Sequence, residues 1–287
     1  MDQDQIVNTI IQTINTIFGN IFSSIDNTIF DNLDNIVFIN KDILNNSFIN
    51  KLLDAGSKNS LIYLADAFLL GISVFYIIRY YYFNIIDAKV EKPVQFFFKL
   101  LLFSLLINFS YFLAEQLLNI TYLFSSAIQE IGKNIIHVDI NFSELISYLN
   151  RILDIDSGEL NLFSFDGLLK SFVSIGFVNL LLAYSLRFVV IQVLILFSPF
   201  SILSLINSST SWIFKSWLRT LISLLLIQVV IPVILIVIFC IDGSNKILLV
   251  GGIYALSRVN SYIKEIFGGV SIDVSNNLGS FVSVLKK

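Results

Sequence analysis

The chain has very few of the residues that carry most enzyme chemistry. Its 287 residues include one cysteine, Cys240, and one histidine, His137. One cysteine excludes an internal disulfide and a cysteine-rich metal site, and a histidine without a second ligand nearby argues against a metal centre. No Gly-x-Ser-x-Gly motif occurs, and no histidine is placed to activate a serine. We therefore expect no enzymatic activity, no metal and no cofactor.

Charged residues are also scarce. They make up 14% of the chain, against about a quarter in soluble proteins. Apolar residues make up 56%, and phenylalanine alone occurs 27 times. This composition predicts an integral membrane protein in contact with lipid. The first five residues contain no Lys or Arg, so we expect no secretory signal peptide.

The first 60 residues are amphipathic and are not expected to form a span. Isoleucine recurs every three or four residues from Ile6 to Ile36, and the opposite face carries Asn, Thr, Gln, Ser and Asp. This spacing predicts a helix or a helical pair, with Gly19-Asn20 as a possible break. No Lys or Arg occurs before Lys41, so the polar face does not suit anionic lipid. We expect this segment to pack against a partner; a helix floating at the interface and a disordered segment are the alternatives.

Five apolar segments approach the length of about 20 residues that a bilayer needs. The expected spans are 61–82, 95–118, 178–205, 220–240 and 247–263. The third lies in an apolar run, 168–206, that we interpret as one long helix because no Gly, Pro or Asn stands close to Arg187 to turn a hairpin. A hairpin at Arg187 is the alternative. The predicted fold class is all-α, with about five transmembrane helices.

The predicted organisation has five parts. They are an extracytoplasmic amphipathic segment (1–60), two transmembrane helices (61–128), an acidic extracytoplasmic loop (129–166), a three-helix transmembrane core (167–269) and a cytoplasmic tail (270–287).

The segment 129–166 carries seven acidic residues, including Asp154, Asp156 and Glu159, against two basic ones. Loops this long usually carry function, and apolar residues around 145–153 suggest short surface helices. Its negative charge repels phosphates, which favours contact with protein over contact with DNA.

Lys and Arg set the expected orientation. With the N-terminus outside, ten basic residues face the cytoplasm and seven face outward, while fifteen acidic residues lie outside and four inside. By the positive-inside rule, the N-terminus is extracytoplasmic and the C-terminus is cytoplasmic.

Three ionisable residues fall inside predicted spans: Asp66, Glu115 and Arg187. A charge at bilayer depth costs roughly 2.5 to 3.5 kcal/mol even on insertion scales, so such residues normally face a bundle interior or water. Two interpretations stay open. Arg187 pairs with one of the acids for structural reasons, or the three line a translocation path or a subunit interface.

The segment 196–239 organises the rest of the chain. It begins with Ser-Pro-Phe around Pro199, turns at Asn207–Thr210, and continues through an aromatic and basic stretch into a span interrupted by Pro232. A proline within a span frees a carbonyl that another group must satisfy, so each proline marks a kink or a packing site. The stretch after the turn places Trp212, Lys215 and Arg219 on one helical face, opposite Phe214, Trp217, Leu218 and Leu221.

The Ser-Pro-Phe turn, the polar loop, the Trp-x4-Trp-Leu-Arg stretch (Trp212, Trp217, Arg219) and the Pro232 span resemble the core of TrbL-type inner-membrane subunits of type IV secretion and conjugation systems. The resemblance covers roughly 187–269. It implies a non-enzymatic, bacterial, multi-pass channel or scaffold in the cytoplasmic membrane. It also implies homo-oligomers, partner subunits that hydrolyse ATP, and transient contact with transferred DNA.

Two other functions compete with this one. A small-solute transporter or permease is the main alternative; it predicts internal repeats and broken spans, and the sequence shows no clear repeat. A holin-like or immunity protein is a third possibility, but the N-terminal segment and the 38-residue loop are elaborate for it.

Overall fold

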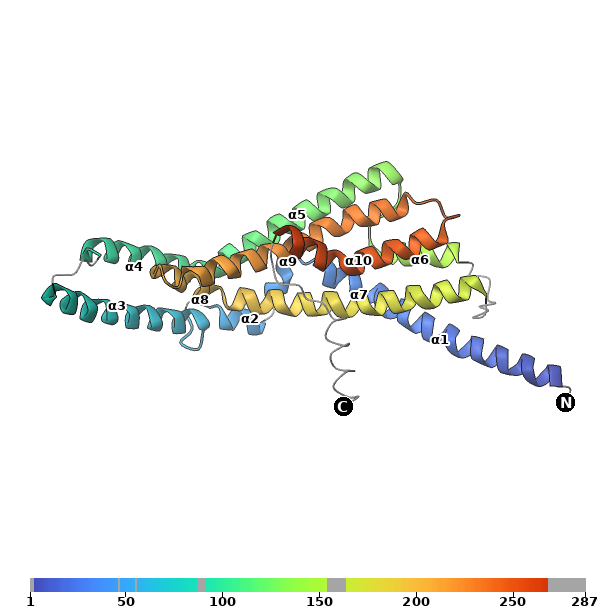
Figure 1. Ribbon diagram of the computed structural model, residues 1–287, viewed down its shortest axis with the longest axis horizontal. Coiled ribbons are helices and arrows are strands. Elements are labelled where there is room, and N and C mark those ends of the chain that lie inside the picture. Colours follow the sequence, from blue (N-terminus) through green and yellow to red (C-terminus); the bar gives the residue numbers. More distant parts are fainter. Residues whose placement is uncertain (1–2, 46, 55, 87–90, 154–163, 268–287) are drawn as a thin grey trace. The chain divides into compact units, whose positions relative to one another are not determined.

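The structure, a computed structural model, describes residues 3–45, 47–54, 56–86, 91–153 and 164–267 (Figure 1). The predicted all-α class is confirmed, since every regular element in this part of the chain is a helix. The predicted tail (270–287) and the centre of the acidic segment, with Asp154, Asp156 and Glu159, lie outside the described residues. The elements are α1 (Gln3–Val37), η1 (Lys41–Asn45), α2 (Ser47–Leu52), α3 (Leu61–Ile85), α4 (Pro93–Asn108), α5 (Ser110–Ile136), α6 (Phe142–Ile152), α7 (Phe165–Leu196), α8 (Ser198–Leu203), η3 (Ser204–Ile206), α9 (Ser211–Phe239) and α10 (Lys246–Phe267).

Three helices, α3, α7 and α9, are long and apolar enough to cross a membrane. A fourth crossing results if α4 and α5 together form one span, but these two helices are bent by 56° where they meet. The predicted span 95–118 is therefore not one straight helix, because the chain breaks at Phe109. The predicted fifth span, 247–263, lies in α10, which is less apolar because it contains Arg258 and Asn260 and is not among these candidates.

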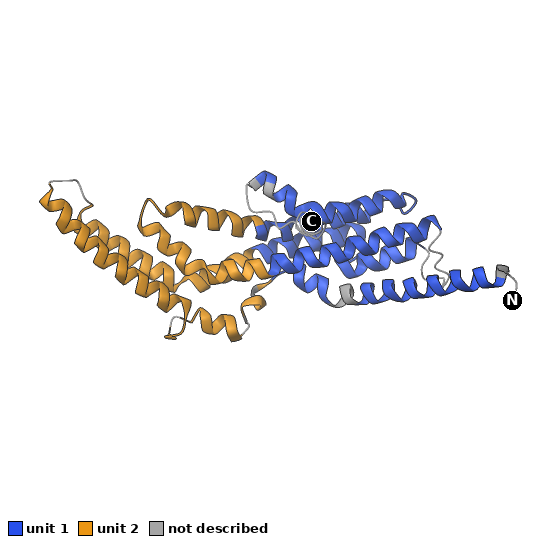
Figure 2. Cartoon of the chain, turned by 60° about the horizontal axis from the view of Figure 1, so that its bottom comes forward, with its two compact units in different colours: residues 1–39, 121–188, 224–287 blue, residues 40–120, 189–223 orange. Residues whose placement is uncertain are grey.

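The chain divides into two compact units, coloured separately in Figure 2. Unit 1 consists of residues 1–39, 121–188 and 224–287, and unit 2 of residues 40–120 and 189–223. The helices α5, α7 and α9 each contribute residues to both units.

In unit 1, α6 is a core helix. Asn141 caps it, accepting a hydrogen bond from the Glu144 backbone N–H at 2.7 Å. The apolar face of α6 is then completely covered, with Phe142 and Leu145 both 0% exposed. The sequence led us to expect short surface helices here. The difference arises because the apolar side chains of α6, including Ile146 and Leu149, fall on one face that unit 1 buries.

Helix α1 is one continuous helix without a break at Gly19-Asn20 (Figure 1). Its C-terminal half packs into unit 1, where Phe22, Leu33 and Val37 are buried. Its N-terminal half instead exposes an apolar stripe, at least 41% for every member. We call it the α1 stripe, and it consists of Ile6, Val7, Ile10, Ile17, Phe18 and Ile21.

In unit 2, α3, α4 and α8 enclose an apolar core that includes Ile62, Leu69 and Ile202. The rings of Tyr76 and Phe96 stack across α3 and α4 with centroids 3.6 Å apart. The outer faces of both helices expose large apolar side chains along their whole length, and we expect lipid to cover a surface of this kind.

The apolar run 168–206 contains no hairpin, because α7 continues through Arg187 to Leu196. It is also not a single helix to its end. The chain breaks at Phe197, and Pro199 lies in the first turn of α8, where its missing N–H costs nothing. The predicted turn is present, with the Thr210 N–H bonded to the Asn207 carbonyl at 3.1 Å, and α9 starts directly after it.

Candidate functional site

The side chain of Arg187 is the largest fully buried one in the described chain, with 0% exposure. Its Nε donates to the Leu224 carbonyl of α9 at 3.0 Å. One terminal nitrogen donates to the Val37 carbonyl at 3.3 Å, and the other donates to Gln228 Oε1, also at 3.3 Å. The guanidinium also lies 5.9 Å from the ring centroid of Tyr184. All these partners belong to unit 1.

None of these acceptors carries a full charge, where the sequence led us to expect a carboxylate. Val37 is the last residue of α1, and the final carbonyls of a helix lack donors within the helix. They also carry the partial negative charge of the helix dipole. Arg187 therefore caps the C-terminus of α1 through neutral hydrogen bonds, and its pairing with Asp66 or Glu115, which belong to unit 2, stays a prediction.

Gln228 extends the same network through both its side chain and its backbone. Its Nε2 donates to the Ile39 carbonyl just beyond α1, at 3.2 Å. Its own carbonyl accepts a hydrogen bond from Ser125 Oγ of α5 at 2.7 Å. In an ideal helix that carbonyl would bond to the residue four positions on, which is Pro232 and has no N–H. The prediction that Pro232 frees a carbonyl satisfied by a neighbouring helix is confirmed.

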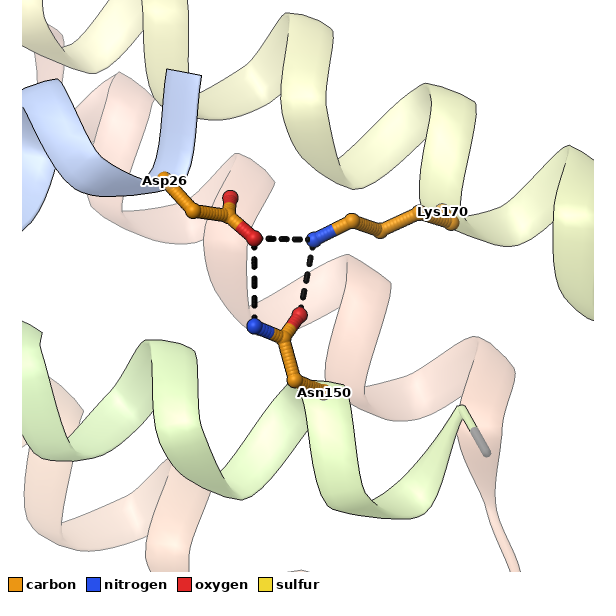
Figure 3. Close-up of polar contacts among 3 residues, drawn as sticks. All are labelled: Asp26, Asn150 and Lys170. Atoms are coloured by element: carbon orange, nitrogen blue, oxygen red, sulfur yellow. Dashed lines mark hydrogen bonds and ion pairs between the residues drawn. The ribbon is translucent and has the colours of Figure 1, made fainter. Parts of the chain in front are cut away.

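A second polar cluster joins α1, α6 and α7 (Figure 3). Lys170 Nζ lies 2.7 Å from Asp26 Oδ2 and also donates to Asn150 Oδ1 at 2.7 Å. Asn150 Nδ2 closes the triangle by donating to the same Asp26 oxygen at 3.1 Å. Lys170 is 1% exposed and Asp26 is 7% exposed, so this is a buried ion pair.

Asp34 adds a third tie between α1 and α6. Its carboxylate accepts hydrogen bonds from the backbone N–H groups of Phe142 and Ser143, at 2.9 and 3.3 Å. A carboxylate at a helix N-terminus satisfies orphan donors and complements the helix dipole. At the other side of α6, burial raises the pKa of Tyr148 above its ordinary value, and its hydroxyl donates to the Ile241 carbonyl at 3.0 Å.

The remaining predicted residues lie in unit 2. Asp66 of α3 accepts a long hydrogen bond, 3.4 Å, from Asn108 of α4, and Glu115 of α5 is half-buried. Trp217 donates its indole N–H to the Leu194 carbonyl at 2.8 Å, close to the break before Pro199. Arg187 belongs to unit 1, so these residues and Arg187 are described in different units.

The faces predicted for the start of α9 are confirmed. Trp212 is 65% exposed, and Arg219 is exposed with it. On the opposite face Trp217 is half-buried and Leu221 is fully buried.

Sequence reasoning missed Asp26, Asn150, Lys170, Ser125 and Gln228. For Asp26 a signal was present, since it follows Phe22 by four residues and so lies on the buried face of α1. Lys170 gave no such signal, because a lysine near the start of an apolar helix usually reaches the interface.

The arrangement joins α1, α5, α6, α7 and α9 within unit 1 through the hydrogen bonds given above. No cluster of three or more His, Cys, Asp or Glu that could hold a metal ion occurs among the residues that were placed. The donors of Arg187 and Lys170 are used within unit 1, and neither side chain reaches the surface.

Comparison with family models, curated proteins and solved structures finds no match for this chain. The class of protein therefore rests on the fold, which is helical with three segments able to cross a membrane and a fourth if the bent pair counts as one. This defines a helical, multi-pass membrane protein.

Proposed function

We propose that the chain is a non-enzymatic channel or scaffold subunit of a membrane machine of the type IV secretion or conjugation class. The observation that supports this best is the contrast within α1. Three sets of buried or part-buried polar contacts hold its C-terminal half, whereas no element among the described residues covers the α1 stripe of its N-terminal half. A firmly anchored helix with a bare apolar face is suited to binding another protein.

A protein partner fits the α1 stripe better than lipid does. Between Gln5 and Ile25 the chain contains no charged residue, so it has no cation to bind anionic headgroups. Its polar face consists of uncharged Asn, Thr and Gln, and hydroxyls such as Thr9 and Thr13 bond back to the helix itself. Copies of the chain and other machine subunits, including the ATPases that supply energy, are the proposed partners.

The experiment is site-specific photocrosslinking from α1 in cells that contain the whole secretion apparatus. A photoreactive residue at Ile10 or Ile17, each 52% exposed, is compared with one at Gln12 or Thr16 on the polar face, which are also exposed. We expect protein adducts from the first pair only. Equal yields from both faces, or lipid adducts alone, would contradict the proposal.

The proposed topology has five crossings, with the N-terminus outside and the C-terminus in the cytoplasm. It counts α4 with α5 as one span and α10 as the fifth. The 22 residues of α10 span about 33 Å at 1.5 Å per residue, which is enough for the hydrocarbon core. One face of α10 is buried, with Leu249, Ile253 and Val259 at most 1% exposed, and the polar Asn260 lies on this buried face at 7% exposure.

Cysteine labelling tests this topology. Cys240→Ser removes the single native thiol, and Gln12→Cys then introduces a reporter on the polar face of α1. A membrane-impermeant maleimide is expected to label intact cells. Labelling only after the cells are opened would reverse the proposed orientation.

A small-solute transporter is the second candidate, and the helix breaks favour it. The 56° bend between α4 and α5 and the break between α7 and α8 resemble the discontinuous helices of transporters. Ion-coupled uptake by a purified, monomeric chain in vesicles would support this alternative against the machine subunit.

A further inference from the structure

Unit 2 contains a partly open apolar cavity of about 230 Å³. Its walls come from α4, α5, α8, η3 and α9, and they include Ser110, Ala114, Ser198, Ile202, Phe214 and Trp217. No charged side chain lines it. It is larger than the ~150 Å³ apolar cavities that take benzene or xenon.

Two hydroxyl groups in the wall have no hydrogen-bond partner in the described part of the chain. They belong to Ser110 and Ser198, whose side chains are each 1% exposed. Leaving a buried hydroxyl unpaired costs about 1 to 3 kcal/mol. Alanine would fill either position without this cost, so the pair indicates a missing partner.

Both serines occur at helix breaks. Ser110 opens α5 directly after the break at Phe109, and Ser198 opens α8 directly after the break at Phe197. Two interruptions that are distant in sequence therefore place a hydroxyl in the wall of one cavity.

Water alone is a poor occupant of this cavity. A water molecule occupies about 30 Å³ and needs two to four polar partners. A cavity of about 230 Å³ would have to hold several waters with only two free hydroxyls among aliphatic and aromatic walls. The Trp217 indole N–H offers nothing further, since it already donates to the Leu194 carbonyl.

We propose that this cavity binds an alkyl chain carrying one oxygen that hydrogen-bonds with the hydroxyls of Ser110 and Ser198. The apolar walls hold the chain, and the neutral hydroxyls select an alcohol or an ester over a charged group. Two sources share this chemistry: a small alkyl alcohol, and the acyl ester region of a membrane lipid.

Trp217 supplies a direct reporter because it lines the cavity. The chain has two tryptophans, so Trp212→Phe leaves Trp217 as the sole indole. This variant is placed in lipid nanodiscs and titrated with bromohexanol, whose bromine quenches indole fluorescence on contact. We expect saturable quenching, and a similar titration with bromohexane is expected to give weaker binding. A second arm uses nanodiscs made with acyl-brominated phosphatidylcholine and no added alcohol.

Two further changes make the result specific. Ala114→Phe fills the cavity and is expected to remove the saturable quenching and any excess quenching by brominated lipid. Ser110→Ala with Ser198→Ala removes almost no volume and is expected to weaken bromohexanol binding about tenfold while leaving bromohexane unchanged.

The two arms identify the source. Saturable quenching by bromohexanol supports a small alcohol, whereas excess quenching by brominated lipid that Ala114→Phe removes supports an acyl ester. The proposal is overturned if neither arm shows these effects, or if bromohexanol and bromohexane bind equally well before and after the serine substitutions.

Discussion

At the scale of single residues, the buried guanidinium of Arg187 finds hydrogen-bond acceptors without a carboxylate. Moving a charge out of water costs several kcal/mol unless hydrogen bonds compensate for it. Arg187 obtains three acceptors, and one of them is the terminal carbonyl of α1, where the helix dipole adds partial negative charge. The same contacts give α1 a fixed end.

Replacing Arg187 with leucine should lower the free energy of unfolding by about 2 to 5 kcal/mol, because the Val37 carbonyl and the Gln228 amide lose a donor while buried. Arg187→Lys, which keeps a donor, should lose less. Thermal unfolding in mild detergent measures both. Asp66→Asn is the matched control, since Asp66 has only one long hydrogen bond, and its stability should change by less than about 1 kcal/mol. A neutral Arg187→Leu variant would contradict the capping role.

The ion pair of Asp26 and Lys170 makes a second prediction at this scale. Lys170→Met leaves the Asp26 charge buried and unpaired, and should cost about 3 to 5 kcal/mol of unfolding free energy. Adding Asp26→Leu to that variant should recover most of the loss, because an apolar pair of similar volume replaces the charges. Chemical denaturation of the wild type, Lys170→Met, Asp26→Leu and the double variant gives this cycle. Equal, additive losses would show that the two charges are not coupled.

Sequence alone identified Arg187 as a special residue but not its partners. A charge inside an apolar run is visible in the sequence, whereas backbone carbonyls and an amide carry no charge that would mark them. Val37 is also 150 positions away and Gln228 is 41 positions away. We expected a carboxylate because a buried charge is costly. The acceptor at the C-terminus of α1, the Val37 carbonyl, comes close to Arg187 only when the helices pack.

At the scale of elements, Pro232 shows how a local defect becomes a contact between helices. The proline removes the N–H that would bond to the Gln228 carbonyl, and Ser125 of α5 takes its place. This explains why α9 continues through the proline as one helix.

This compensation can be tested by a rescue. Ser125→Ala should lower the free energy of unfolding by about 1 to 3 kcal/mol, because it leaves the Gln228 carbonyl unpaired. In a Pro232→Ala background the same change should cost much less, since alanine restores the helical N–H. The free energy of unfolding is measured for the wild type, Ser125→Ala, Pro232→Ala and the double variant. An equal cost of Ser125→Ala in both backgrounds would contradict the proline explanation.

Glycine contacts position α5 and α10 against α9. A Cβ atom at Gly132 of α5 would lie 2.6 Å from Ile236, and one at Gly252 of α10 would lie 2.6 Å from Ile238. Small residues let helix backbones approach closely in lipid, and Gly252 does so here.

Gly132→Ala should therefore destabilise the protein by about 1 to 3 kcal/mol through overpacking. Gly19→Ala in α1 is the control, because a Cβ there meets nothing within 4 Å. It should stabilise the helix by about 0.5 to 1 kcal/mol. Melting curves of both variants check the signs, and a stabilised Gly132→Ala would show that α5 and α9 are not in close contact.

The elements that could be predicted from the sequence are those that depend on residues close together in the chain. The apolar run of α3, the faces of α9 and the turn at Asn207 depend on residues within a few positions of one another. The role of α6 did not follow, because an amphipathic helix in an acidic segment suits a surface as well as a core. The break at Phe109 also gave no signal, since neither Gly nor Pro stands there.

At the scale of the whole molecule, the exposed apolar surfaces are of two kinds. On α3 and α4 they belong to helices without a polar face, as expected for contact with lipid. On α1 they form one stripe opposite an uncharged polar face, as expected for contact with protein. The central claim is that this stripe binds subunits of a larger membrane assembly.

The most direct test is the mass of the assembly extracted from the native membrane in mild detergent. The account predicts that the intact chain is recovered in a large complex with further copies and ATPase subunits. Replacing Ile10 and Ile17 with asparagine should release it as a smaller species, while the polar-face changes Gln12→Asn and Thr16→Asn should not. Recovery of the intact chain as a monomer, with the same mass as the Ile10 and Ile17 variant, would contradict the claim.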